Sequence, residues 1–187
     1  KVEITLESNP EDLNLKKIKE LKDCHLNRLS LGVQSFKDSD LKYMNRGHSS
    51  HQSLLCIKNL KNFGFENISI DLIFGLPNQS NSDWKFNLMQ AFKLGIQHFS
   101  AYCLTVEPNT LLAKQVKKNP SYLPSENQVI DHFTLLMDIS KEYSFDQYEI
   151  SNYAKKGFES KHNTNYWKRR SYLGIGPSAH SFNGKSR

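Results

Sequence analysis

Hydrophobic and polar positions alternate along the first 110 residues in a pattern that favours strands separated by helices. Four segments are rich in β-branched and aromatic residues and end at Gly, Pro or a polar cluster, as strands do: Val2–Glu7, Arg28–Gln34, Ile68–Phe74 and His98–Leu104. Between them, apolar residues recur at helical spacing in Asp12–Leu21, Ser49–Phe63 and Ser82–Leu94. This order predicts an α/β fold with a parallel sheet covered by helices, either doubly wound or barrel-like.

The ends of the two longer helices carry expected capping residues. Ser49 and Ser82 stand where a serine side chain can accept a hydrogen bond from the first turn. Gly64 and Gly95 follow the last periodic residues, where a helix commonly ends in a left-handed conformation.

After Pro108 the alternation stops. Asn119–Ser125 contains two prolines and is expected to be a linker, and Glu126–Glu142 has the periodicity of an amphipathic helix. The remainder is aromatic, contains glycine and is expected to be irregular. We therefore divide the chain into residues 1–110 and an extension of residues 111–187.

The charge of the chain changes this picture little. Lys and Arg number 25 against 19 Asp and Glu, which gives a formal charge of +6. The excess is scattered, so it does not indicate a nucleic-acid surface, although it suits an anionic small ligand. The basic cluster 168–170 stands beside aromatic residues, and a solvated turn is its ordinary explanation.

The apolar runs and the cysteines indicate the kind of cellular compartment in which the protein works. The longest apolar run, Leu72–Leu76, is too short to span a bilayer. Cys24, Cys56 and Cys103 lie far apart and have no CxxC spacing, which argues against a disulfide framework or a metal knuckle. We expect a reduced, cytoplasmic protein.

Polar residues stand at the carboxyl ends of the expected strands. They are Glu7, Gln34, Asp71, and Thr105 or Glu107. In parallel α/β proteins ligands bind at these ends, because the loops converge there. One buried acid is most often paired for structural reasons, but acids and amides on successive strands predict a binding site.

Asp71 lies inside the apolar run SIDLIFGLP and therefore needs a hydrogen-bond donor. Ligand hydroxyls, a ligand ammonium group or Arg46 could supply it. Arg46 precedes the helix that starts at Ser49, where its guanidinium could hold a carboxylate through two hydrogen bonds. A surface arginine that caps the preceding turn is the structural alternative.

Five segments form a recognisable set: ESNP (residues 7–10), RLSLGVQSF (28–36), MNRG (44–47), DLIFGLPNQ (71–79) and EPNT (107–110). Together they resemble the oxygen-independent coproporphyrinogen III oxidase-like radical SAM proteins, and more closely their haem-chaperone branch, HemW. The resemblance implies a partial parallel (β/α) TIM-like radical SAM barrel with a carboxyl-terminal α+β extension. It also implies that Glu7, Gln34, Arg46 and Asp71 contact S-adenosylmethionine.

The hydrogen-bonding groups of these four side chains agree with that assignment. Glu7, Gln34 and Asp71 can accept hydrogen bonds from ribose hydroxyls, and Arg46 suits the amino-acid carboxylate of the cofactor. The family also binds a [4Fe–4S] cluster through CxxxCxxC, which is missing from this sequence. We therefore expect the chain to begin at the third of about six barrel strands, to leave one sheet edge exposed, and to be inactive alone.

The segment HNTNYW, residues 162–167, similarly resembles a motif of the haem-chaperone branch. His162 is then a predicted axial ligand of haem iron, with aromatic residues for the macrocycle and residues 168–170 for the propionates. A loop histidine with aromatic residues packed on the barrel edge is the structural alternative. His180 is a second candidate, for which a structural role is favoured.

The resemblance predicts a haem chaperone that binds S-adenosylmethionine, a [4Fe–4S] cluster and haem, and that transfers haem to acceptor proteins. An electron donor is implied, and a membrane-associated acceptor stays open. The alternative is a coproporphyrinogen III oxidase, or dehydrogenase, that decarboxylates propionate side chains by radical SAM chemistry. A third reading is a barrel hydrolase or lyase with Glu7 and Asp71 as an acid–base pair, which gives Arg46 and Gln34 no role.

Overall fold

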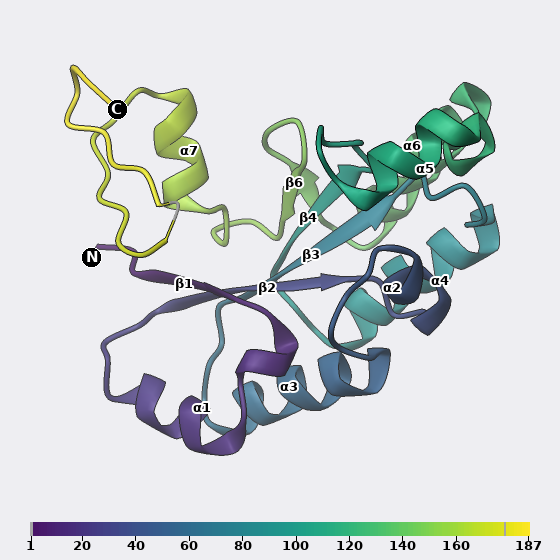
Figure 1. Ribbon diagram of the computed structural model, residues 1–187. Coiled ribbons are helices and arrows are strands. Elements are labelled where there is room, and N and C mark those ends of the chain that lie inside the picture. Colours follow the sequence, from purple (N-terminus) through teal and green to yellow (C-terminus); the bar gives the residue numbers. More distant parts are fainter. Residues whose placement is uncertain (1, 178) are drawn as a thin grey trace.

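A six-stranded mixed sheet organises the computed structural model, which describes residues 2–177 and 179–187 (Figure 1). Its strands are β1 (Thr5–Ser8), β2 (Arg28–Gln34), β3 (Ile68–Phe74), β4 (His98–Cys103), β5 (Asp146–Gln147) and β6 (Asn152–Ala154). Their spatial order is β1-β2-β3-β4-β6-β5. The first four strands are parallel, as the alternation predicts, whereas β6 pairs antiparallel with both β4 and β5.

Helices follow the strands. They are η1 (Pro10–Asp12), α1 (Leu15–Lys22), α2 (Asp38–Tyr43), α3 (Ser50–Asn62), α4 (Asn81–Lys93), α5 (Leu111–Lys118), η2 (Pro120–Tyr122), α6 (Glu126–Glu142) and α7 (Lys161–Trp167). In Figure 1, α1 and α3 lie on one side of the sheet and α7 lies on the other. No helix in the described parts of the chain is long and apolar enough to cross a membrane.

The hydrophobic core fills the space between the sheet and helices α1, α3, α4 and α6. Alternate residues of the central strands point into it, and they are fully buried: Leu29, Leu31, Val33, Ile68, Ile70, Leu72 and Phe99. Trp84 of α4 and Leu136 of α6 pack against them from the helical side. This burial of apolar side chains is the main force that holds the helices on the sheet.

The opposite face of the sheet is polar, because successive residues of a strand point to opposite sides. Cross-strand partners show which residues share it: Glu7 with Ser30, Ser69 with His98, Asp71 with Ser100, and Ser100 with Asn152. We call this surface the polar face; it comprises Thr5, Glu7, Arg28, Ser30, Gly32, Gln34, Ser69, Asp71, His98, Ser100, Tyr102 and Asn152. An apolar face against the helices and a polar face on the other side predict a ligand site on the polar side.

The capping predictions are partly confirmed. Ser49 forms a capping box with Gln52, and Gly64 and Gly95 have the expected positive φ angles of 81° and 61°. The prediction of Ser82 as an N-cap is wrong, because α4 begins one residue earlier and Ser80 caps it in a box with Asp83.

The expectations for the extension need a larger correction. It is not irregular after residue 142, because β5, β6 and α7 form there. Residues 98–100 of β4 pair with residues 152–154 of β6, so β4 is an inner strand. The expected open edge lies at β1, which pairs with β2 alone. The linker also holds a short helix, η2, and α2 and α5 were not expected. The division at residue 110 stays a prediction.

Candidate functional site

Three side chains converge over Gly32 in the middle of β2. A Cβ atom placed on Gly32 would lie 2.9 Å from Nε2 of Gln34, 3.0 Å from Oδ1 of Asn9 and 3.4 Å from Nη2 of Arg46. No side chain fits beneath these groups without displacing them, so glycine at this position lets the three polar groups approach the strand. Gln34 and Arg46, two residues named from the sequence, therefore lie together.

Local backbone geometry aims Gln34 at this place. The register of β2 against β3 shifts between Leu31 and Gln34, which marks a bulge, and Gln34 has φ of 66°. A non-glycine residue in the left-handed region is uncommon and occurs where the surroundings fix it. The end of β2 is thus bent from the regular ladder next to the predicted binding position.

Arg46 is held by the turn after β1. Its Nη2 donates to Oδ1 of Asn9 at 2.5 Å, and its backbone N donates to Leu41 O at 2.9 Å. Its Nε is buried and has no hydrogen-bond partner among the described residues. A buried guanidinium nitrogen without a partner is costly, and an anionic ligand group would satisfy it.

Asp71 occupies the centre of the polar face and is partly buried. Burial raises its pKa to about 6, with a smaller contribution from Glu7 in the same direction. Ser100, Arg28 and Arg46 oppose this rise in pKa. The strand register gives its place: Asp71 precedes Leu72, which pairs with Gln34, and Glu7 pairs with Ser30 on the same face.

Glu7 is exposed at the end of β1, on the same face as Asp71. The structure therefore brings Glu7, Gln34, Arg46 and Asp71 to one region of the polar face. That they contact S-adenosylmethionine stays a prediction. Glu7 and Asp71 do not lie at separate ends of the sheet, so their positions alone do not exclude the acid–base pair of the hydrolase reading.

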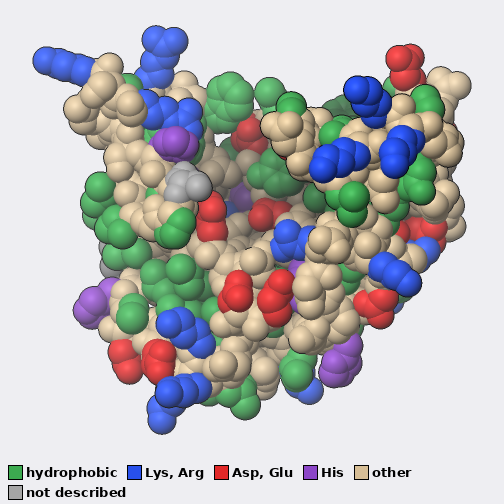
Figure 2. Space-filling view, in the orientation of Figure 1, with side chains coloured by type: hydrophobic (Ala, Val, Ile, Leu, Met, Phe, Trp, Pro, Cys, Tyr) green, Lys and Arg blue, Asp and Glu red, His purple; other side chains and the backbone are tan. Residues whose placement is uncertain are grey.

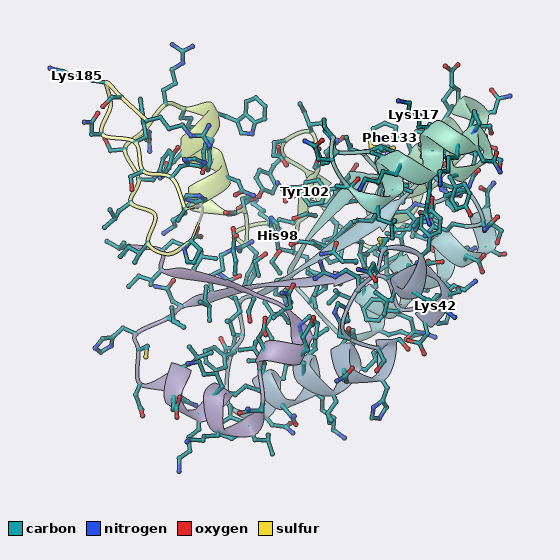
Figure 3. All side chains as sticks on the ribbon, viewed as in Figure 1. Lys42, His98, Tyr102, Lys117, Phe133 and Lys185 are labelled. Carbon is teal, nitrogen blue, oxygen red and sulfur yellow. The ribbon has the colours of Figure 1, made fainter. Side chains whose placement is uncertain are left out.

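This region opens into a hollow, which we call the notch, between α7 and the α5–α6 pair. Figure 2 shows the notch with acidic side chains at its floor. His98 and Tyr102 lie below it on β4, and Tyr102 is 43% exposed (Figure 3). A ligand could thus reach the polar face from solvent.

His162 lies in the first turn of α7 and is half-buried. Its ring contacts Tyr166 and Tyr172 edge-on, with centroid distances of 4.8 and 5.1 Å. Its backbone N donates to Oε1 of Glu3 at 2.9 Å. Within the described part of the chain no hydrogen bond occupies either ring nitrogen, so the imidazole has a nitrogen free to bind a metal.

Exposed apolar and basic side chains lie at the end of α7 and in the segment that follows it. Trp167 is 61% exposed, Leu173 and Ile175 are more so, and the basic residues 168–170 follow Trp167 directly. His180 is exposed in the irregular segment after Tyr172. Both haem assignments, His162 and His180, stay predictions.

Several residues of this region were missed by sequence reasoning. They are Asn9, which orients Arg46; Arg28, a buried base on the polar face; and His98 with Tyr148, whose side chains are hydrogen-bonded. Alternation in RLSLGVQ and HFSAYC places Arg28 and His98 on the face opposite the core, and this signal could have identified both.

Metal-ligating side chains do not cluster among the described residues. No group of three or more His, Cys, Asp or Glu side chains among them could hold a metal. Cys24 and Cys103 are exposed and Cys56 is buried, and all three are free thiols.

Comparison with known proteins defines the class. Residues 1–88 match the sequence model of the radical SAM superfamily, and the chain belongs to this superfamily. Within it, the chain is 40% identical over 185 residues to heme chaperone HemW of Bacillus subtilis, covering 99% of this chain and 49% of that protein. Heme chaperone HemW of Escherichia coli is 36% identical, covering 95% and 46%. The chain thus spans about half the length of the curated relatives it matches.

Solved structures agree on the fold. Coproporphyrinogen III oxidase (HemN) of Escherichia coli, a radical SAM enzyme, superimposes with a TM-score of 0.79 at 24% identity, over 97% of this chain and 44% of that one. Elp3 of the archaeon Methanocaldococcus infernus gives a TM-score of 0.63 at 25% identity, over 72% and 32%. The predicted α/β radical SAM fold is therefore confirmed.

Proposed function

We propose that this chain forms the S-adenosylmethionine- and haem-binding part of a haem chaperone. The observation that carries the proposal is the convergence of Gln34, Arg46 and Asn9 over Gly32, beside Asp71 and Glu7. Superfamily membership implies S-adenosylmethionine and a [4Fe–4S] cluster, and the similarity to HemW proteins supports haem as the cargo.

The residues present fit S-adenosylmethionine. Its amino-acid carboxylate would satisfy the unpartnered Nε of Arg46, and its ribose hydroxyls would donate to the carboxylates of Glu7 and Asp71. The cofactor, when bound with the cluster, supplies the precursor of radical chemistry. The residues of this chain bind and orient it, and the pKa of Asp71, about 6, leaves that carboxylate ionised and able to accept hydrogen bonds at neutral pH.

The residues around His162 also fit haem. Imidazole is a usual axial ligand of haem iron, and its edge contacts with Tyr166 and Tyr172 hold the ring in one orientation. Trp167, Leu173 and Ile175 offer exposed apolar surface for a macrocycle. The basic residues 168–170 lie next to that surface and could pair with propionates.

The test is a haem titration of the full-length, cluster-loaded protein followed by its Soret band. His162→Ala should remove the low-spin spectrum and weaken binding, whereas His51→Ala, at an exposed position of α3, should behave as the wild type. Unchanged spectra and affinity in His162→Ala would exclude His162 as the ligand.

The coproporphyrinogen III oxidase reading is the second candidate, because the fold matches that of HemN. It predicts decarboxylation of coproporphyrinogen by the cluster-loaded protein with S-adenosylmethionine. Product formation at a rate dependent on Asp71 would favour this reading over the chaperone. The hydrolase reading finds no support in membership of the radical SAM superfamily.

The remaining partners are proposals of the same kind. A haem-acceptor protein and an electron donor follow from the chaperone function, and the acceptor could be membrane-associated. No nucleic acid is proposed, because the positive charge is scattered. The cytoplasmic setting is proposed from the three free thiols.

A further inference from the structure

Two chains of hydrogen bonds connect the polar face of the sheet with α7. Both run through neighbouring residues of the segment between β5 and β6, Tyr148 and Glu149. This segment is part of the sequence YEISNYA, residues 148–154, to which the proposed function assigns no role. Its position between two proposed ligand sites suggests one.

The first chain reaches the amino end of α7. Ser69 Oγ lies 2.6 Å from Nδ1 of His98, and Nε2 of His98 lies 2.7 Å from the hydroxyl of Tyr148. That hydroxyl accepts from the backbone N of Ser160 at 3.2 Å, and Ser160 caps α7 by accepting from Asn163 N. The cap of α7 is thus attached to the amino ends of β3 and β4.

The second chain reaches the carboxyl end of α7. Ser100, which lies beside Asp71 in the parallel ladder, donates from Oγ to Oδ1 of Asn152 at 2.7 Å. Nδ2 of Asn152 donates to Oε1 of Glu149. Oε2 of Glu149 accepts from Nε1 of Trp167 at 3.2 Å.

Glu149 connects Asn152 with Trp167 in the second chain. Its carboxylate accepts from three donors, since Ser151 N also donates to Oε1 at 3.0 Å. A carboxylate serves this purpose because all three neighbours are N–H donors. An amide in its place would turn its own NH₂ group toward one or more of them, and the contact would be lost.

We propose that Glu149 is a positioning residue for the haem site: it fixes α7, and with it His162, relative to the polar face of the sheet. The proposal rests on the proposed function of His162 as the haem ligand. α7 has seven residues, none of them buried, so its own packing holds it weakly. Its place depends on hydrogen bonds from outside the helix, at Glu3, Tyr148 and Glu149.

The experiment compares Glu149→Gln with Glu142→Gln in the full-length, cluster-loaded protein. Glu142 is exposed at the end of α6, and its side chain forms no hydrogen bond or ion pair among the described residues, so it provides the same chemical change. Hydrogen bonds to a charged group contribute enough that Glu149→Gln should weaken haem binding about tenfold or more. The low-spin Soret spectrum should shift toward high spin as His162 loses its orientation, and this spectroscopic change would not follow from a loss of stability alone.

A second measurement tests the contact without haem. Trp84 is fully buried and Trp167 is 61% exposed, so iodide should quench the fluorescence of Trp167. A Trp167→Phe variant identifies the part of the signal that comes from Trp167. Glu149→Gln should raise the quenching constant of Trp167. If neither quenching nor the haem spectrum differs from Glu142→Gln, the proposal is overturned.

The two proposals fail in different ways. If the wild type binds no haem through His162, the proposed function fails, and the quenching result still decides whether Glu149 fixes α7. If His162 binds haem and Glu149→Gln leaves affinity, spectrum and quenching unchanged, only the role of Glu149 is refuted.

Discussion

Oε2 of Glu11 lies 2.8 Å from Nδ1 of His48, which joins the turn after β1 to the loop after α2. The other ring nitrogen of His48 lies 3.0 Å from Val33 O, and the imidazole is buried. Arg46 lies in the same loop and reaches Asn9 in the same turn. Two contacts, therefore, fix the loop that presents Arg46 to the proposed cofactor.

Removal of the first contact should loosen this loop without unfolding the protein. We expect Glu11→Ala to weaken binding of S-adenosylmethionine by the cluster-loaded, full-length protein about tenfold, or roughly 1.4 kcal/mol. Isothermal titration measures this change. Glu20→Ala removes a carboxylate from an exposed pair with Lys17 and should leave the affinity unchanged. Equal affinities in the two variants would show that Glu11 does not position Arg46.

A methyl group at Gly32 should disturb the same site from beneath. Gly32→Ala places a Cβ atom 2.9 Å from Gln34 Nε2, so the ends of Gln34 and Asn9 must move. Both are flexible side chains, and the fold should therefore survive, which far-UV circular dichroism can check. Affinity for S-adenosylmethionine should fall at least tenfold, whereas Ser30→Ala, two residues earlier on the same face, serves as the control. Wild-type affinity in Gly32→Ala would place the cofactor elsewhere.

The sequence predicted the parallel strands well because their apolar runs report burial directly. It also named Glu7, Gln34, Arg46 and Asp71, which the fold brings to one region, although that selection came from family resemblance. Asn9 lies in the segment ESNP but was given no role, and Glu11 lies outside the five segments. Their importance arises from contacts with residues some 37 positions away, which no local pattern encodes.

The elements that the sequence did not predict also depend on contacts that no local pattern encodes. β6 has three residues, too few for a periodic signal, and exists because the edge of β4 offers it hydrogen bonds. α7 is short and contains no buried residue, so its formation depends on Ser160, Glu3 and Glu149 rather than on an apolar stripe. Ser80 was passed over for Ser82 because two serines stand near the same helix start, and backbone geometry decides between them.

The two serines allow a direct test of that cap. Ser80 Oγ accepts from Asp83 N, and Ser80 N donates to Asp83 Oδ2. Ser80→Ala should lower the free energy of unfolding by about 1 kcal/mol in urea denaturation. Ser82→Ala should change it by less than about 0.5 kcal/mol, as an exposed substitution normally does. The reverse order would return the cap to Ser82.

His98 should make the fold sensitive to acid. Burial lowers its pKa to about 3, with Arg28 acting in the same direction, whereas in the unfolded chain it titrates near 6.5. Between these values the unfolded state binds the proton, so the free energy of unfolding should fall as pH decreases, by up to about 1.4 kcal/mol per pH unit. His98→Gln should flatten this slope between pH 6 and pH 4. The exposed His51→Gln variant should retain it, and an unchanged slope in His98→Gln would mean that His98 is protonated in the fold.

Asp71 should change the free energy of unfolding with pH in the direction opposite to His98. Burial raises its pKa to about 6, so between about pH 4 and pH 6 the folded state binds the proton and the unfolded state does not. Stability associated with Asp71 is therefore present at low pH and is lost as pH rises through 6, by about 3 kcal/mol in total. Asp71→Asn has no charge to bury and should be more stable than the wild type at pH 8, with the difference disappearing near pH 4.

The same substitution should abolish function if Asp71 binds the cofactor. A protein that keeps an ionised carboxylate at a cost to its fold does so where a ligand uses the charge, a common feature of binding sites. Urea denaturation at pH 4 and pH 8 measures the stability of the variant, and titration of S-adenosylmethionine measures its binding. Higher stability with lost binding is the expected pair of results. Higher stability with normal binding would remove Asp71 from the site, and lower stability at pH 8 would show that hydrogen bonds from Ser100 and its neighbours outweigh the cost of burial.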